Sequence, residues 1–355
     1  MKNSNERREK KEWYFPKLFF TLIISFAATY FAGIALEERE KKKAYEKFYS
    51  LPYITFEADN TQVFRLSNEI SNLEYSVGES EWTKLGTQNI VFGGSRGKLL
   101  LRGTNKWGTS RRYINHHGGE FRIWSTVSFA TDAQVICSGD IRTLIDYLNY
   151  NTVSTKEARF QKLFENCTQL VVAPELHATN LADKCYESMF SGCTSLKTAP
   201  DLPADTLSEE CYKLMFSGCT SLERIPDLPA KILAFGCYEK MFSGCTSIKE
   251  VPDVLRVTDL VSRCYWGMFS NCTSLEIVDD LPAEILANGC YSEMFSGCTS
   301  LSQITMMATD INDKSCLDDW LKCTAQTGTF GKNKNATWKN DGIIPHGWKV
   351  NLIDP

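Results

Sequence analysis

Residues 185–210 read CYESMFSGCTSLKTAPDLPADTLSEE, and nearly the same 26 residues return at 211–236 as CYKLMFSGCTSLERIPDLPAKILAFG. Further copies begin at Cys237, Cys264 and Cys290, and a degenerate copy, RFQKLFENCTQLVVAPELHATNLADK, occupies residues 159–184. A fixed period of this size is typical of a solenoid, in which each unit packs on its neighbours. The sequence therefore predicts a stack of five clear units and one degenerate unit.

Within each unit, the apolar residues Cys, Met, Phe and Cys follow one another at spacings of four, one and three, which would place one face of a short helix inward. Directly before the second Cys, four units have a glycine, at a place where a helix ends in a left-handed residue, and asparagine replaces it at positions 166 and 271. A leucine or isoleucine then enters an extended stretch that carries a proline in most copies. We therefore expect an α/β-repeat solenoid.

The 355 residues of the chain, at about 150 residues per domain, suggest two or three folded units. A hydrophobic share of 43% and a charged share of 23% are typical of globular proteins. The net charge of −4 is too balanced for a protein that binds nucleic acid by neutralising phosphates. The pattern divides the chain into an N-terminal segment (1–51), a β domain (52–140), the repeats (141–315) and a C-terminal cap (316–355).

A 19-residue stretch without charge, LFFTLIISFAATYFAGIAL, runs from Leu18 to Leu36. About 20 apolar residues are needed for a helix to cross a bilayer, so this stretch predicts a membrane anchor. The small residues Gly33-Ile34-Ala35 would also suit cleavage, which would make the segment a signal peptide. An apolar helix buried in an assembly is a further alternative. The protein is therefore expected to be membrane-anchored and facing outside the cytoplasm, or exported.

Residues 53–140 show short alternating apolar runs separated by Gly, Asn, Asp and Ser, which predicts an antiparallel β-sandwich. Three tryptophans, Trp82, Trp107 and Trp124, fall in this region. Their flat faces would suit sugar stacking, although tryptophans more often belong to the core or its rim. Both interpretations remain open at the level of sequence.

The repeat unit resembles the BspA-like leucine-rich repeats of surface proteins from gut Bacteroidetes, in the variety written CYxxMFxGCTSLxxxPxLPAxxLA. The resemblance covers residues 160–315, and the tail TGTFGKNKNATWKNDGIIPHGWKV resembles the ending that follows such arrays. The resemblance implies a curved solenoid, a location outside the cytoplasm and a recognition role, with no catalytic residues. Residues 253–256 depart from the D-L-P-A of the other units.

Thirteen of the fourteen cysteines form two interleaved series between residues 167 and 323. The first series is Cys185, Cys211, Cys237, Cys264, Cys290 and Cys316, and the second is Cys167, Cys193, Cys219, Cys245, Cys272, Cys298 and, after a step shortened to 25 residues, Cys323. Eight residues along a helix span about 12 Å, too far for both cysteines of one unit to join in a disulfide or bind one zinc ion. Equivalent positions of stacked units lie about 5 Å apart, so inter-unit disulfides are an alternative. We expect a ladder of small buried thiols.

Carboxylates recur eight residues after the cysteine of the second series. Stacking would bring these like charges together, which costs stability unless backbone amides, water or cations compensate. Bonds to the backbone of a proline-rich turn are one interpretation, and Ca²⁺ or a basic ligand is the other. The residues of this acidic row are Glu175, Asp201, Asp227, Asp253 and Asp280.

The two residues after the Leu of each T-S-L motif vary while their neighbours repeat. We expect them to face solvent in register, where substitutions can change a ligand-binding surface without disturbing the packing of the units. Relaxed constraint on a solvated face would give the same variation. The residues of this variable row are Lys197, Thr198, Glu223, Arg224, Lys249, Glu250, Glu276, Ile277, Ser302 and Gln303.

These observations favour a non-enzymatic recognition or adhesion protein that binds a protein or glycan through its repeats, with no cofactor unless Ca²⁺ binds the acidic row. A structural or host-attachment protein of a bacteriophage is the alternative. The chain has four histidines and no HExxH, phosphate loop or nucleophile elbow. A carbohydrate-active enzyme is the weaker alternative, because two acids could converge in the fold.

Overall fold

The computed structural model describes residues 52–355, apart from 79, 115–119, 252–254, 312–313 and 341. Residues 52–355 form one compact unit. The predicted hydrophobic helix at 18–36 lies outside the described residues. Within the described part of the chain, no helix has the length and hydrophobicity that a membrane crossing requires.

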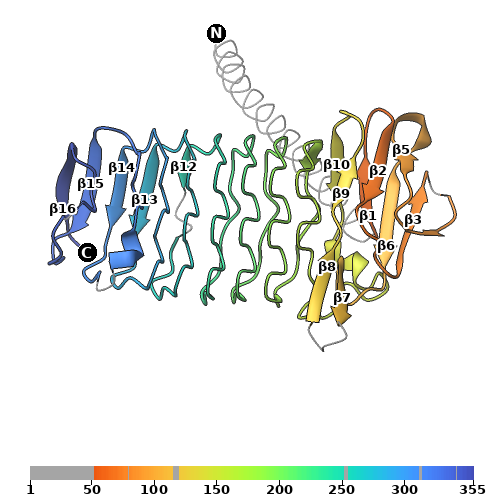
Figure 1. Cartoon of the computed structure of the whole chain (residues 1–355), viewed down its shortest axis with the longest axis horizontal. Coiled ribbons are helices and arrows are strands. Elements are labelled where there is room, and N and C mark those ends of the chain that lie inside the picture. The colour runs from red at the N-terminus through yellow and green to blue at the C-terminus, as the bar shows by residue number, and fades with distance from the viewer. Residues whose placement is uncertain (1–51, 79, 115–119, 252–254, 312–313, 341) are drawn as a thin grey trace, which may run out of the picture. The chain divides into compact units, whose positions relative to one another are not determined.

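The N-terminal part of the compact unit consists of short strands in three sheets (Figure 1). The strands are β1 (Ile54–Glu57), β2 (Gln62–Leu66), β3 (Leu73–Val77), β4 (Thr83–Lys84), β5 (Ile90–Phe92), β6 (Leu99–Gly103), β7 (Ser110–Ile114), β8 (Glu120–Trp124), β9 (Val127–Phe129) and β10 (Val135–Ser138), with a 3₁₀ turn η1 (Gly94–Arg96). One sheet has the order β11-β10-β1-β6-β3-β4, a second has β5-β2-β9, and β7 and β8 form a hairpin.

Aromatic side chains join the first two of these sheets. The ring of Phe56 on β1 lies 5.5 Å from the ring of Phe64 on β2 and 6.0 Å from that of Phe129 on β9, measured between centroids. All three side chains are buried. The alternation of apolar residues that predicted strands here therefore serves a core shared by two sheets.

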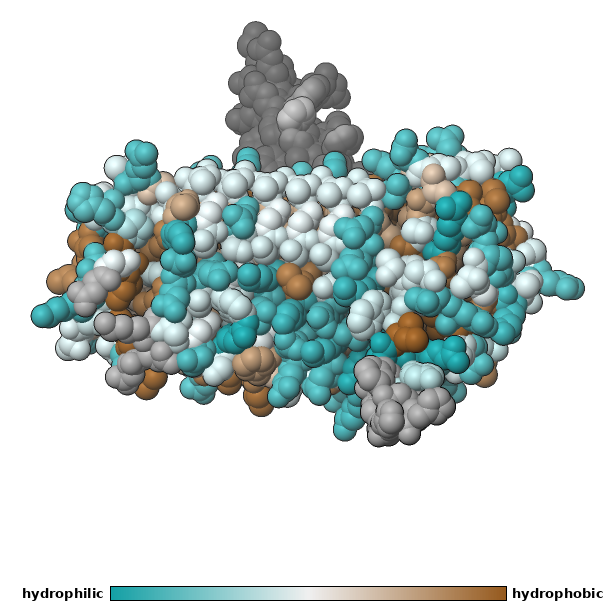
Figure 2. Space-filling model, viewed as in Figure 1, coloured by the Kyte–Doolittle hydropathy of each residue, from teal (hydrophilic) through white to brown (hydrophobic). Residues whose placement is uncertain are grey.

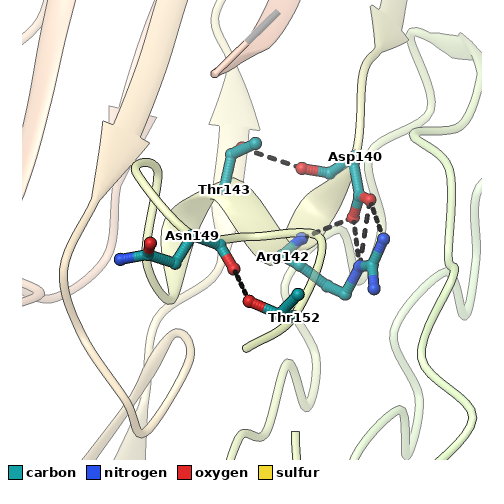
Figure 3. Close-up of polar contacts among 5 residues, drawn as sticks. All are labelled: Asp140, Arg142, Thr143, Asn149 and Thr152. Atoms are coloured by element: carbon teal, nitrogen blue, oxygen red, sulfur yellow. Dashed lines mark hydrogen bonds and ion pairs between the residues drawn. The ribbon is translucent and has the colours of Figure 1, made fainter. Parts of the chain in front are cut away.

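The β region passes into the repeats without a break in its sheet or its core. Strand β10 pairs in parallel with β11 (Leu170–Val172), which belongs to the degenerate unit. A 3₁₀ turn, η2 (Ile141–Leu144), connects the two regions (Figure 3). It is capped by Asp140, which accepts a hydrogen bond from the backbone N–H of Arg142 (2.9 Å) and an ion pair from its guanidinium (2.7 Å). One cluster of buried residues extends from β1 to the C-terminal strands.

The repeats contain turns where the sequence predicted short helices, and the described residues include no α-helix. Amide groups alternate between two partners along each unit. The amide of Met189 bonds to the carbonyl of Tyr186 within its unit (3.1 Å), and the amide of Phe190 bonds to Met215 of the next unit (2.9 Å). A helix would use all of these amides internally, whereas this coil uses every second one to bind its neighbour.

Left-handed residues recur every four positions in this coil. In one unit they are Lys184, Ser188 and Gly192, with φ of 59°, 55° and 74°. The cysteine–methionine–cysteine spacing of four therefore reflects tight turns of four residues, which place apolar residues inward at nearly the same interval as a helix. The α/β description was wrong for this reason.

The core of the array is two rows of stacked rings. Five tyrosines, from Tyr186 to Tyr291, lie 5.6–6.1 Å apart between centroids of successive units. A parallel row of phenylalanines, from Phe164 to Phe295, has centroid distances of 5.5–5.8 Å. At the C-terminal end, Trp320 makes a tilted contact with Phe295 and ends the regular stacking.

The extended half of the later units forms a parallel sheet that includes the C-terminal segment. Its strands are β12 (Glu250–Val251), β13 (Ile277–Leu281), β14 (Gln303–Met306), β15 (Gly328–Asn333) and β16 (Trp348–Ile353), in that spatial order, and a 3₁₀ turn η3 (Lys314–Leu317) precedes β15. Residues 328–353, expected only as a cap, thus extend the sheet by two strands.

Candidate functional site

The variable row lies on the surface as expected. Every one of its residues is exposed except Ser302, which is half-buried. The leucine before each pair is fully buried, and the residue after it is buried or half-buried, so only the variable pair faces solvent. The exposure of these positions is confirmed, and their role in binding stays a prediction.

Hydrogen bonds hold the variable row in register from unit to unit. The amide of Glu223 bonds to the carbonyl of Lys197 (3.1 Å), and the amide of Glu276 bonds to that of Lys249 (2.9 Å). Thr198 is paired with Arg224 in a parallel bridge. These bonds use backbone atoms only, so the side chains of the row can change without loss of the pairing.

The row continues into the C-terminal strands, which the sequence did not indicate. Gln303 on β14 is in register with Thr329 on β15, and Thr329 with Lys349 on β16. The signal was hidden because residues 328–353 lack the C-T-S-L motif that marks the other units. The candidate surface is therefore two strands longer than the repeats alone predict.

Charges alternate along the first column of the row, where Lys197, Glu223, Lys249 and Glu276 succeed one another. Opposite charges on neighbouring strands attract weakly, so this order avoids the repulsion of like charges. Figure 2 shows mostly hydrophilic and near-neutral residues over the middle repeats on the face in view, with a few hydrophobic residues among them and more towards the two ends. The middle of the array thus offers a surface of mixed charge.

The acidic row does not come together as one group in the described residues. Asp201, Asp227 and Asp280 are exposed, and Asp253 lies outside the described residues. No cluster of three or more His, Cys, Asp or Glu suited to a metal ion is found in the described part of the chain. Ca²⁺ binding by this row stays an untested prediction.

Glu175, the first residue of the acidic row, is half-buried at the start of the array. Its Oε1 accepts a hydrogen bond from the amide of Gly139 (3.1 Å), and its backbone is bridged to Asp140. Burial raises the pKa of Glu175, and the neighbouring Asp140 carboxylate adds to that rise. Glu175 therefore joins the β region to the repeats through Gly139 and Asp140, which lie outside its own turn, and the turn interpretation of this row stays a prediction.

A second line of charges follows the turns that begin each unit, and sequence reasoning missed it. Glu210 lies 2.8 Å from Lys184 of the preceding unit and also pairs with Lys213 of its own unit, and Lys213 lies 3.0 Å from Glu239. Burial alone raises the pKa of Glu210, but hydrogen bonds from Lys184 and Lys213 outweigh it and hold that pKa below its ordinary value. The signal was present as alternating Glu, Lys and Glu two residues after the first Cys of successive units.

The cysteines are thiols in this structure, and all but Cys323 are buried. In the second series, the five thiols from Cys193 to Cys298 each donate to the carbonyl of a phenylalanine in the preceding unit, and Cys167 donates to the carbonyl of Val127 on β9. Cys219 Sγ lies 3.1 Å from the oxygen of Phe190, and Cys245 Sγ lies 3.1 Å from that of Phe216. Burial raises the pKa of Cys219 to about 12. Buried thiols of this kind are poor nucleophiles, which favours a packing role.

Cys323 occupies a glycine position of the repeat. The amide of Gly297 bonds to the carbonyl of Lys322, just as Gly192 bonds to Ser217, so Cys323 aligns with Gly218. Its φ is 59°, in the left-handed region of the equivalent glycines. The sequence assigned Cys323 to the buried series with a shortened step, and this assignment was wrong by one residue.

These features define a class: a solenoid of short stacked units with an invariant interior and a variable exposed row. Residues 159–276 and 238–322 match the family described as BspA type leucine rich repeat region, in six copies. The repeat region of the chain therefore belongs to the BspA-like leucine-rich repeats. The degenerate unit at residue 159 is confirmed as part of the array. Searches of curated proteins and of solved structures found no significant match.

Proposed function

We propose that this chain is a non-enzymatic recognition protein whose repeat array binds a protein partner through the variable row. The observation that carries the proposal is an exposed row of residues that change from unit to unit while backbone hydrogen bonds keep them in register. Around that row, stacked rings, thiols and left-handed turns repeat almost unchanged. The match of the repeats to the BspA type leucine rich repeat family is consistent with a role in surface recognition.

The chemistry of the row supports a protein over a polyanion. Arg224 and Glu250 are exposed one unit apart, and Lys and Glu alternate beside them. A surface with both signs of charge gives specificity through complementary charges on its partner, whereas a polyanion needs a surface of one sign. The parallel backbone keeps these side chains at fixed spacing, so little freedom is lost on binding.

We also propose an exported or membrane-anchored location for the array. The support is the uncharged stretch at 18–36, with anchor and cleaved signal as its two alternatives, together with the surface location expected of the repeat family. The packing of two sheets through Phe56, Phe64 and Phe129 supports the predicted β-sandwich ahead of the repeats.

The test is a protein array probed with the full-length chain and with a charge-reversed variant, Arg224→Glu, Lys249→Glu and Glu250→Lys. The matched control is Arg256→Glu, which lies in the same part of the chain outside the row and changes the net charge by the same two units. We expect partners that bind the unmodified chain and the control but lose the charge-reversed variant. Partners that bind all three alike would place recognition elsewhere and contradict the proposal.

A further inference from the structure

The hairpin of β7 and β8 is fixed to the first repeat unit by its backbone. The amide of Thr109 bonds to the carbonyl of Arg159 (2.9 Å), and the amide of Arg159 bonds to that of Trp107 (3.1 Å). Between them, Gly108 has a φ of 72°, and a Cβ there would lie 2.5 Å from the Arg159 carbonyl oxygen. Only glycine allows this approach, so the hairpin has a fixed position beside the repeats.

A cleft of about 460 Å³ lies between β8 and the opening turns of the first two units. Figure 1 shows β8 as the strand of the hairpin that is nearer to the repeats. The cleft is lined by Arg122, Trp124, Arg159, Gln161, Lys162, Asp183, Lys184 and Glu187. Four of these side chains carry positive charge and two carry negative charge. Lys184 also pairs with Glu210 (2.8 Å), and Lys162 lies 3.5 Å from Glu165, so acidic side chains outside the lining partly neutralise these two lysines.

Of the three tryptophans considered above as sugar platforms, Trp124 is the one that lines this cleft. Trp82 is covered by the guanidinium of Arg102, which lies 3.9 Å from its ring centroid. Lys106 lies 4.4 Å from the ring of Trp107. Trp124 is 37% exposed, and the Lys162 ammonium lies 5.3 Å from its ring centroid. An apolar ring face and a cation therefore adjoin each other within the cleft.

The other polar groups of the cleft are held in place by hydrogen bonds. Arg159 Nε donates to the Asp183 carbonyl oxygen at 2.8 Å. Gln161, which is 6% exposed, donates from Nε2 to Glu187 Oε2 at 2.7 Å. The arrangement depends on the degenerate unit, because Arg159 stands where the following units have the first Cys and Lys162 stands where they have residues such as Ser188.

We propose that this cleft binds an acidic sugar residue, a hexuronate or a sialate, of a glycan. A sugar ring has a face of C–H groups that packs on an indole, which Trp124 supplies. Its carboxylate would pair with Lys162 and the neighbouring arginines through charge-assisted hydrogen bonds. Its hydroxyls would donate to the carboxylates of Asp183 and Glu187.

The two carboxylates distinguish this ligand from a phosphate group. A phosphate carries up to two negative charges and no hydroxyl donors when fully ionised, so Asp183 and Glu187 would repel it. An acidic sugar carries one negative charge and several donors, which uses both signs of charge in the lining. The site is separate from the variable row and does not depend on the proposed protein partner.

The experiment measures binding of tetragalacturonate and of sialyllactose to the full-length protein by saturation-transfer NMR. Fully methyl-esterified tetragalacturonate and lactose are the neutral counterparts. The variants are Trp124→Ala and Lys162→Gln, and the matched control is Trp266→Ala, a partly exposed tryptophan three units beyond Lys184 in the same row of turns. Circular dichroism establishes that each variant is folded.

We expect at least one acidic probe to bind, its neutral counterpart to bind at least about tenfold more weakly, and both cleft variants to lose about tenfold or more in affinity. The Trp266→Ala control should bind like the unmodified chain. Absence of binding by both acidic probes at 10 mM (~3 kcal/mol or less of binding free energy) would overturn the proposal. So would equal binding of the neutral probes, equal loss in the control, or inorganic phosphate competing as well as the acidic sugar. If Trp124→Ala does not fold, Lys162→Gln alone decides, because it changes one half-buried surface charge.

Discussion

The repeats and the β region are built on different principles although they share one core. In the repeats, a residue such as Phe216 lies between two copies of itself, at 5.5 Å from Phe190 and 5.6 Å from Phe242. In the β region, Phe56 makes tilted or edge contacts with three different neighbours, Phe64 on β2, Phe129 on β9 and Phe164 in the degenerate unit. The repeats therefore use the same ring-to-ring contact in every unit, whereas each aromatic contact in the β region occurs once.

The largest expected effect is on the central ring of the phenylalanine row. Phe216→Ala removes a buried ring and both of its stacking contacts, so we expect the free energy of unfolding to fall by ~3–5 kcal/mol. Phe235→Ala, at an exposed position of the same array, should lower it by less than ~1 kcal/mol. Urea denaturation measures both, and similar losses in the two variants would mean that the stacked row does not carry the core.

Two glycines with nearly the same φ allow the junction of the hairpin with the first unit to be compared with the middle of the array. At Gly218 (φ 74°) a Cβ would meet its nearest neighbour at 3.8 Å, so Gly218→Ala should cost only the left-handed strain, ~1–2 kcal/mol. At Gly108 (φ 72°) a Cβ would also overlap the Arg159 carbonyl, which adds ~1–3 kcal/mol. Thermal unfolding should rank Gly108→Ala as the more destabilised variant. The reverse order would show that the hairpin is not fixed to the first unit.

The repeats could be predicted further than the β region because each position was observed several times. Six related copies separated buried residues from exposed ones, so the variable row and the left-handed glycines could be found without a structure. The turn coil could not be distinguished from a helix, because four-residue turns and a 3.6-residue helix bury nearly the same positions. The cleft beside Trp124 could not be predicted either, because it depends on the bonds of Trp107 and Thr109 to Arg159, which lies about 50 residues further along the chain.

The ion pairs of Glu210 with Lys184 and Lys213 predict that the free energy of unfolding depends on pH. The pKa of Glu210 is below its ordinary value in the folded chain, so its contribution to stability is present in full above the unfolded pKa of about 4.3 and is lost as the pH falls through the lower folded value. Glu210→Gln should therefore lower the free energy of unfolding by ~0.5–1 kcal/mol at pH 7. The difference between the two proteins should shrink towards pH 3. A difference that stays constant from pH 7 to pH 3 would be inconsistent with the ion pairs.

The smallest expected effect is at Cys323, where the repeat has a glycine elsewhere. Cys323→Gly should raise the free energy of unfolding by up to ~1 kcal/mol, because glycine adopts a positive φ without strain. In the native protein, Cys323 should be the cysteine that iodoacetamide modifies, and the thirteen buried thiols should react only after denaturation without reductant. Mass spectrometry of protein exported from the cytoplasm measures this, and blocked cysteines after denaturation would indicate inter-unit disulfides instead.

The central claim is that folding and recognition use separate positions of the repeat. The most direct test replaces Glu223-Arg224 with the uncharged Ser-Gln pair of the last unit, residues 302 and 303, and measures urea unfolding of the full-length chain. The backbone bonds of the row involve neither side chain, so we predict a free energy of unfolding within ~0.5 kcal/mol of the unmodified protein. A loss of ~2 kcal/mol or more would contradict the claim, because it would show that the side chains of the variable row are needed for folding.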